Sequence, residues 1–216
     1  MDNLKIKQKI ISYDNIKEIS DFIKNGKIII LPAKTIYGIS CRFDLEDSLK
    51  RICKIKGRNE TIPFIILISK IEDLFNFTSE ISEDCKKLIN CYWNKDNPDS
   101  VTMIFKKNSK IADFITGGKN TIAIRRAEFK FVREIIDNSY PLVSTSATVS
   151  GIKNNPVKLK DIDERILKKV DLIVEFEEKL KGIESTIIDT TGSEIKLIRE
   201  GAVSFNSILQ KLQIKI

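Results

Sequence analysis

The spacing of apolar residues along the chain predicts amphipathic helices. Isoleucine recurs every three or four positions within 14–25, which is typical of a helix with one buried face. A second helix is predicted over 44–56, with Asp44 and Asp47 as a capping pair at its start. The same periodicity predicts further helices at 82–92, 129–137, 160–167 and about 205–212.

Strand signals alternate with these helices. The short apolar runs at 27–31 and 64–68 are typical of strands buried on both faces, whereas 121–125 alternates between its two faces. Further strands are predicted at 101–105, 142–146, 171–174, 186–189 and 195–199, the last two as an antiparallel pair. Interleaved strands and helices, with no repeats and no linker, predict a single α/β domain built around a mixed sheet over 1–216.

The composition narrows the chemistry. The 216 residues include 37 Lys and Arg against 30 Asp and Glu, and the net charge of +7 favours anionic partners such as nucleotides, phosphates or RNA. The chain has no histidine, which excludes Ser-His-Asp and Cys-His catalysis and histidine-based zinc sites. Proton transfer therefore depends on carboxylates, Lys, Tyr, Cys, the substrate or water.

Cysteine usage and hydropathy predict a cytoplasmic location. No C-x-x-C pair is present, so we expect reduced and mostly buried thiols. The N-terminus has no apolar stretch of signal-peptide length, and no run approaches the roughly 18 apolar residues of a membrane helix. We therefore expect no contact with a membrane. The cysteines are Cys41, Cys53, Cys85 and Cys91.

Several segments at strand or helix ends could carry a binding site. The loop 32–38 follows a buried strand, and Lys56 and Arg58 flank a glycine that can direct both cations at one anion. The others are 144–151, which is rich in hydroxyls, and the segments 184–186 and 199–201. Each also has an ordinary structural explanation, such as turn formation or cations at a helix C-terminus. The chain lacks G-x-x-x-x-G-K-[ST] and G-x-G-x-x-G, so a bound nucleotide requires another arrangement.

Seven motifs follow one another in a characteristic order. They are 32–39 (family pattern P-T-D/E-T-x-Y-G-L), Lys56 with Arg58 (K-x-R), 98–102 (P-x-P-V-T), 116–125 (T-x-G-x-x-T-v-a-v-R), 144–151 (S-T-S-A-N-x-S-G), 184–189 (P-S-T-I-v-D) and 196–201 (I-L-R-x-G). In this order they resemble the YrdC/TsaC family of threonylcarbamoyl-AMP synthases. The resemblance extends from about 16 to 201, which is most of the chain.

The resemblance implies both a fold and a reaction. It implies a twisted α/β fold with a large mixed sheet around a basic concave surface, with a core of about 16–201 and a C-terminal helix at about 205–212. The implied reaction makes threonylcarbamoyl-adenylate and pyrophosphate from L-threonine, bicarbonate or carbon dioxide, and ATP, for threonylcarbamoyladenosine modification of tRNA. The tRNA and a downstream threonylcarbamoyl-transfer complex are implied as further partners. Mg²⁺ is expected to arrive with ATP, since phosphates supply much of its coordination, and no protein-held metal is expected.

The resemblance also assigns site residues. Lys56 and Arg58 are the implied catalytic pair, contacting the phosphates and the threonine carboxylate or carbamate. The other implied ATP contacts are Ser146, Thr148, Ser185 and Arg199. The implied threonine and bicarbonate contacts are Thr35, Arg58, Thr116, Thr121 and Ser185. Because the threonine amine is itself the nucleophile, catalysis would rest on positioning and charge stabilisation.

Several positions depart from the family pattern, including Ser100 and Asn59, each of which replaces a proline, and three departures bear on the site. Ala33 and Lys34 stand where the family has Thr and an acid, and Thr148 stands where it has Asn. Lys34 reverses the local charge, and a threonine hydroxyl has one donor where an amide has two. A second hypothesis is therefore a non-catalytic relative that binds RNA or nucleotide, which strongly salt-dependent RNA binding would favour. A third is another carbamoyl or acyl-adenylate chemistry.

Overall fold

One sheet of ten strands forms the framework of the molecule. The computed structural model describes residues 9–152 and 154–213. The strand order is β1-β8-β2-β3-β7-β4-β6-β5-β9-β10, and β4 is parallel to β6 but antiparallel to β7. The strands are β1 (Lys9–Ser12), β2 (Ile29–Pro32), β3 (Tyr37–Arg42), β4 (Ile65–Ile68), β5 (Val101–Lys106), β6 (Thr121–Arg126), β7 (Leu142–Ser146), β8 (Leu172–Glu175), β9 (Thr186–Asp189) and β10 (Lys196–Arg199). The predicted α/β class with a mixed sheet is confirmed.

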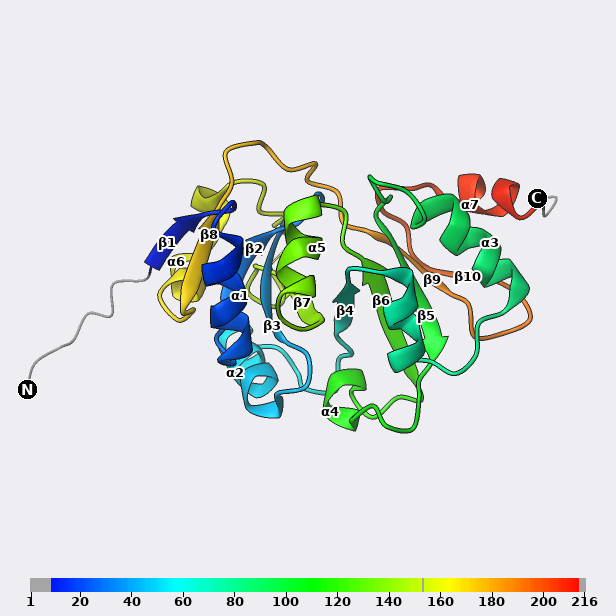
Figure 1. Cartoon of the computed structure of the whole chain (residues 1–216), viewed down its shortest axis with the longest axis horizontal. Helices are drawn as coiled ribbons and strands as arrows, with labels where there is room; N and C mark the ends of the chain where they lie inside the picture. Colours follow the sequence, from blue (N-terminus) through cyan, green and yellow to red (C-terminus); the bar gives the residue numbers. More distant parts are fainter. Residues whose placement is uncertain (1–8, 153, 214–216) are drawn as a thin grey trace, which may run out of the picture.

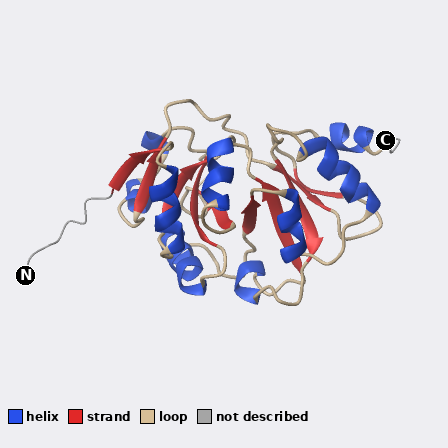
Figure 2. Cartoon of the chain, in the orientation of Figure 1, coloured by secondary structure: helices blue, strands red, loops and turns tan. Residues whose placement is uncertain are grey.

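Helices pack against the sheet along its whole length. They are α1 (Ile16–Lys24), α2 (Glu46–Lys56), α3 (Glu83–Tyr92), α4 (Asp113–Thr116), α5 (Lys130–Asp137), α6 (Glu164–Leu167) and α7 (Phe205–Lys211), with 3₁₀ helices η1 (Ile71–Asn76) and η2 (Leu159–Asp161). The helices α1 and α5 lie side by side in one half of the molecule, and α3 and α7 lie together at the other end (Figure 1). Figure 2 shows the strands extending through most of the length of the molecule, with helices beside them in both halves.

The strand β2 shows why a continuous apolar run marks a central strand. Ile29 and Leu31 pack with residues of α1 and α5, whereas Ile28 and Ile30 belong to the larger core cluster. All four side chains are buried. The strand also pairs antiparallel with β3 and parallel with β8, so both its faces and both its edges are covered. The prediction of a strand buried on both faces is confirmed here.

The strand β3 lies where the sequence pattern predicts only a loop and an unassigned stretch. It pairs with β2 and β7, and its first five residues are buried. Its small and polar residues give no apolar run, so the hydrophobicity pattern does not predict a strand there. Ser40, for example, is fully buried because its hydroxyl donates to Ser144 Oγ at 3.0 Å. The loop predicted over 32–38 is therefore a tight turn of 33–36 between two strands.

Two details of the predicted helices are wrong. The helix predicted over 160–167 is two short pieces, η2 and α6, because Asp163 caps α6 by accepting from Arg165 N at 2.8 Å. The capping pair Asp44–Asp47 does not form, since α2 begins after Leu45 without a side-chain cap and Asp44 binds Arg42 instead. The elements β1, η1 and α4 were not predicted at all.

The core agrees with the expected thiol chemistry. Cys41, Cys53 and Cys85 are buried, Cys91 is partly buried, and all four thiols are free. Burial raises the pKa of the Cys85 thiol to about 11, which keeps it protonated and unreactive at neutral pH. None of the helices in the described ranges has the length and apolar character needed to cross a lipid bilayer.

Candidate active site

A cavity of about 410 Å³ opens on one face of the sheet. Its floor is a row of residues in register on four adjacent strands, namely Ser144 (β7), Ile65 (β4), Ala123 (β6) and Ile104 (β5). Alternate residues of a strand share a face, so residues in register line the same side of the sheet. These floor positions are only partly buried. The cavity is thus an uncovered area of an otherwise buried sheet face.

The walls of the cavity are strongly cationic. The described residues that line it include Arg58, Lys119, Arg125 and Arg199, against a single carboxylate, Glu184. Five hydroxyls also line it, from Thr35, Ser144, Thr145, Ser146 and Ser185. This combination of guanidinium groups and hydroxyl donors suits an anion with several oxygen atoms.

Arg58 enters the cavity from the turn that ends α2. Gly57 adopts a left-handed conformation (φ 61°), and this turn directs the next residue away from the helix. The guanidinium donates to Pro63 O at 2.7 Å and to Thr145 Oγ1 at 3.4 Å, and it lies 4.9 Å from the centre of the Phe64 ring. Burial lowers its pKa below the usual value. Its Nε is buried with no partner among the described residues, so the group retains unused donor capacity.

Lys56 lies beneath the cavity wall and does not line the cavity. Its side chain is 2% exposed, and its ammonium donates to Thr148 O at 2.6 Å and to Ser146 O. Burial, together with the positive charge of Arg58, lowers the pKa of Lys56 to about 8. The ammonium therefore connects α2 to the segment after β7. The sequence predicts that both cations point at one anion. In this structure only Arg58 of the two lines the cavity.

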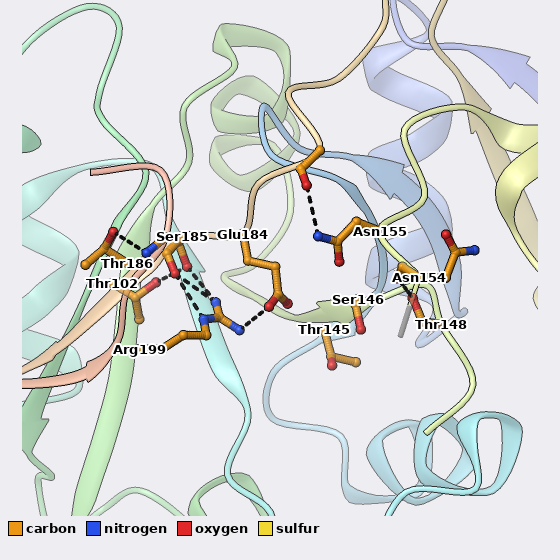
Figure 3. Close-up of polar contacts among 12 residues, drawn as sticks. Thr102, Thr145, Ser146, Thr148, Asn154, Asn155, Glu184, Ser185, Thr186 and Arg199 are labelled. Atoms are coloured by element: carbon orange, nitrogen blue, oxygen red, sulfur yellow. Dashed lines mark hydrogen bonds and ion pairs between the residues drawn. The ribbon is translucent and has the colours of Figure 1, made fainter. Parts of the chain in front are cut away.

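A hydrogen-bonded group at the ends of β9 and β10 forms the opposite wall (Figure 3). Arg199 donates to Ser185 O at 2.9 Å through Nη2, and its Nη1 lies 2.8 Å from Glu184 Oε2. The Ser185 hydroxyl is bonded to Thr102 Oγ1 at 2.8 Å. Burial lowers the pKa of the Arg199 guanidinium, and the Glu184 carboxylate acts against this effect. The sequence motifs at 184–186 and 199–201 therefore form one site.

The predicted site residues divide into two groups. Five of them line the cavity, namely Thr35, Arg58, Ser146, Ser185 and Arg199. Four do not, namely Lys56, Thr116, Thr121 and Thr148. Thr116 is buried at the end of α4, Thr121 pairs with Lys106 at the start of β6, and the Thr148 hydroxyl donates to Asn154 O at 2.9 Å.

Sequence reasoning missed three charged residues of the cavity. Arg125 is two positions after Ala123 on β6, so strand alternation could have placed it on the floor side. Its Nε lies 3.6 Å from the buried carboxylate of Glu128. Glu184 was visible only as a neighbour of Ser185. Lys119 lies between α4 and β6, in a segment with no periodic signal.

The two departures from the family pattern in the 33–36 turn differ in their position relative to the cavity. Ala33 lines the cavity, whereas Lys34 does not. The backbone of the 33–36 turn is held by the segment before β9, since Lys181 N donates to Lys34 O at 3.1 Å and Gly182 N donates to Thr35 O at 2.8 Å. The charge reversal at Lys34 therefore falls outside the lining of the cavity.

Comparison with known proteins assigns the family. A family model named Sua5_yciO_yrdC and described as "Telomere recombination" matches residues 21–201, which is more than half of the chain. The chain belongs to the Sua5/YciO/YrdC family. This confirms the resemblance inferred from the motifs.

Two relatives with assigned names align with most of this chain. It is 31% identical to the threonylcarbamoyl-AMP synthase of Pyrococcus abyssi over 89% of this chain, but covers only 56% of that protein. It is also 31% identical to a putative threonylcarbamoyl-AMP synthase of Methanocaldococcus jannaschii, with 89% of this chain and 90% of that protein covered. The chain thus spans little more than half of the first relative and nearly all of the second.

Solved structures of this family share the fold. The crystal structure of P. abyssi Sua5 complexed with L-threonine is 29% identical, with a TM-score of 0.85, and the match covers 95% of this chain and 60% of that one. The structure of E. coli YciO matches with a TM-score of 0.81 at 21% identity over 94% of this chain and 99% of that one. The latter likeness supports the fold alone.

Proposed function

We propose that this protein is a threonylcarbamoyl-AMP synthase, which forms threonylcarbamoyl-adenylate and pyrophosphate from L-threonine, bicarbonate or carbon dioxide, and ATP. One observation carries the proposal. A cavity lined by four cations and five hydroxyls lies in a chain that aligns over 95% of its length with a relative complexed with L-threonine. Both the amino-acid carboxylate and the phosphates of ATP are anions that such a cavity binds.

The cavity contains the groups that this reaction needs. The threonine ammonium loses a proton to solvent, and the free amine attacks the carbon dioxide equivalent, with loss of water when bicarbonate is the donor. The resulting carbamate attacks the α-phosphorus, and pyrophosphate leaves. No side-chain nucleophile is required, which agrees with a chain that has no histidine. In this proposal Arg58 holds a carboxylate or carbamate, and Arg199 and Ser185 hold phosphate oxygens. Fixed positive charge of this kind stabilises the negative charge that accumulates on the oxygen atoms.

We propose that Mg²⁺ enters with ATP. The described residues contain no group of three or more Asp, Glu or Cys side chains that could hold a metal ion. The one carboxylate of the cavity, Glu184, is already paired with Arg199. A phosphate-bound Mg²⁺ needs few or no protein ligands, so this donor set fits a magnesium–ATP complex. When bound with ATP, Mg²⁺ would add positive charge at the phosphates to that of the guanidinium groups in the cavity.

The proposed role in tRNA modification follows from the product. Threonylcarbamoyl-adenylate is an activated mixed anhydride, so a further reaction must transfer its threonylcarbamoyl group. Contact of this chain with tRNA or with a transfer complex is part of the proposal. The predicted cytoplasmic location agrees with this role.

The test is direct product detection. Purified protein is mixed with L-threonine, bicarbonate and Mg-ATP, and pyrophosphate and threonylcarbamoyl-adenylate are measured by mass spectrometry. A product that depends on threonine supports the proposal. ATP binding without product, together with strongly salt-dependent RNA binding, would instead support a non-catalytic binding protein. Product formation only from carbamoyl phosphate would indicate a different carbamoyl chemistry.

A further inference from the structure

The cavity contains one group that anion binding does not explain. Glu184 is the only carboxylate among the described residues that line it, and it faces a cavity with four cationic side chains. An amino acid brings an ammonium group as well as a carboxylate. The cations repel that ammonium, so it needs an acceptor with negative charge.

The Glu184 carboxylate has free capacity for such a ligand. Its Oε2 lies 2.8 Å from Arg199 Nη1, and Arg199 is its one ion-pair partner among the described residues. Its side chain is 35% exposed, so a ligand can reach it. Figure 3 shows the carboxylate pointing into the space between Arg199 and the hydroxyls of Thr145 and Ser146. The carboxylate therefore has one cationic partner and is accessible to a second.

The backbone holds Glu184 in a fixed position. Its carbonyl accepts from Ala202 N at 2.9 Å. The chain at Gly201 packs so closely that a Cβ there would lie 2.3 Å from Glu184 O. The next carbonyl, Ser185 O, is held by the Arg199 guanidinium. A carboxylate fixed before the ligand arrives loses little conformational freedom on binding.

We propose that Glu184 binds the α-amino group of the amino-acid substrate. This inference rests on the proposed function and deepens it, since it identifies what distinguishes an amino acid from a simple hydroxy acid in the cavity. The ammonium donates to Glu184 Oε1, while the substrate carboxylate remains available to the Arg58 guanidinium across the cavity. Glu184 is thus a specificity residue that touches substrate, and Arg199 keeps its bond to Oε2.

A matched pair of ligands tests this role without ATP. L-Threonine and 3-hydroxybutyrate differ only by the α-amino group, and their dissociation constants are measured by calorimetry for wild type and Glu184→Gln. We expect wild type to prefer threonine by at least about tenfold, as for other charge-assisted hydrogen bonds. In Glu184→Gln the preference should fall to about threefold or less, through weaker threonine binding alone. Glu194→Gln, an exposed carboxylate in the β9–β10 turn, should behave as wild type.

The contrary outcomes are distinct. Equal weakening of both ligands by Glu184→Gln, or unchanged threonine binding, would overturn the inference. If Glu184 only oriented Arg199, the KM for ATP would rise and the KM for threonine would not. We expect the reverse, with the KM for ATP within about threefold of wild type. If wild type makes the adenylate and Glu184→Gln keeps the wild-type threonine affinity, the inference about Glu184 is wrong and the proposed function stands. If wild type binds no threonine and makes no product, the proposed function is wrong as well.

Discussion

Two cations separated by a single glycine have different environments in this protein. Arg58 is partly exposed in the cavity, whereas the Lys56 ammonium is enclosed by backbone carbonyls. A guanidinium keeps its charge under almost any condition, and its planar fork can bind an anion while it still donates to protein carbonyls. An ammonium is more easily deprotonated when it is buried. Arg58 is thus suited to substrate contact and Lys56 to holding the wall in place.

Replacement of Arg58 tests the first of these roles. Arg58→Ala removes the guanidinium that faces the cavity, so adenylate formation should fall by at least about tenfold, the effect of losing one charge-assisted bond. The rate is measured as pyrophosphate release at saturating and at limiting threonine. Lys54→Ala, an exposed cation on the same helix, is the control and should keep the wild-type rate. Near-normal turnover by Arg58→Ala would remove Arg58 from the site.

Lys56 predicts a pH-dependent stability. Burial lowers its pKa in the folded protein to about 8, whereas an exposed lysine has a pKa of 10.5, so between these pH values the unfolded chain binds the extra proton. Stability from this group therefore rises as pH increases through that window. The gain from pH 8 to 9.5 should be about 1.5 kcal/mol, because the full slope of 1.36 kcal/mol per pH unit is reached only above the folded pKa. Urea unfolding of wild type and of Lys56→Met measures it as a difference that grows with pH. A constant difference would contradict the lowered pKa.

The residues of the site show how far a sequence can predict geometry. Thr35, Ser146 and Arg199 follow or end strands, and Ser185 directly precedes β9. Strand ends gather at the edges of a sheet, so the convergence of these residues could be predicted. Thr116, by contrast, lies in a short helix whose existence no pattern indicated. A sequence motif gives residue identity and order, but the direction of a side chain depends on tertiary packing. For the same reason Lys56 and Arg58 could not be separated in advance.

At the scale of elements, the junction of β9 and β10 fixes one wall of the cavity. The two strands pair antiparallel, as the sequence predicts, but with an irregular register between Leu197 and Arg199. After β10 the chain turns closely against the start of β9. Gly201 N donates to Thr186 Oγ1 at 3.0 Å, and Val203 N donates to the same oxygen at 3.1 Å. The wall is therefore held by the turn after the strand as much as by the strand pairing.

Gly201→Ala should disturb this wall. The added methyl group would lie 2.3 Å from Glu184 O, which is backbone and cannot move independently. Overpacking of this kind costs about 1–3 kcal/mol, so the free energy of unfolding should fall by that amount. The KM values for threonine and ATP should rise together because Glu184 and Arg199 are displaced. Gly192→Ala in the same hairpin meets no atom nearer than 3.7 Å and should change neither property. An unaffected Gly201→Ala would show that this junction adapts easily.

Elements were predictable where the apolar pattern is unambiguous. The strands β2 and β4 are continuous apolar runs and the helix α1 has apolar residues at helical spacing, and the sequence placed all three within two residues of their observed ends. The strand β3 escaped because Gly38 and Ser40 are buried by close backbone packing and a hydroxyl pair. The segment 159–167 escaped because Asp163 can cap a new helix as well as continue an old one.

At the scale of the whole molecule, the cavity belongs to no single half of the sheet. Its lining is drawn from the β2–β3 turn and β7 on one side and from β9 and β10 on the other. A ligand that contacts both sides is bound only when the entire sheet is in place. Binding should therefore stabilise the whole fold and not one local segment.

Ligand binding should raise the free energy of unfolding. At a Mg-ATP concentration of one hundred times its dissociation constant, the increase should be about 2.7 kcal/mol. A chain of this size should then unfold several degrees higher, which thermal unfolding by circular dichroism measures. Arg58→Ala should reduce the shift produced by threonine. Hydrogen exchange that slows only near 33–36, with no change in β9 or β10, would contradict a site shared by both halves.

The lining of the cavity extends from Ala33 to Arg199, so its two sides are synthesised at different times. On a ribosome, β2 and the turn after it emerge long before β9 and β10. A nascent chain that stops before β9 has one side of the cavity without the other, and it cannot hold ATP or threonine between them. The appearance of ligand affinity during refolding would therefore mark the moment at which β9 and β10 join the sheet.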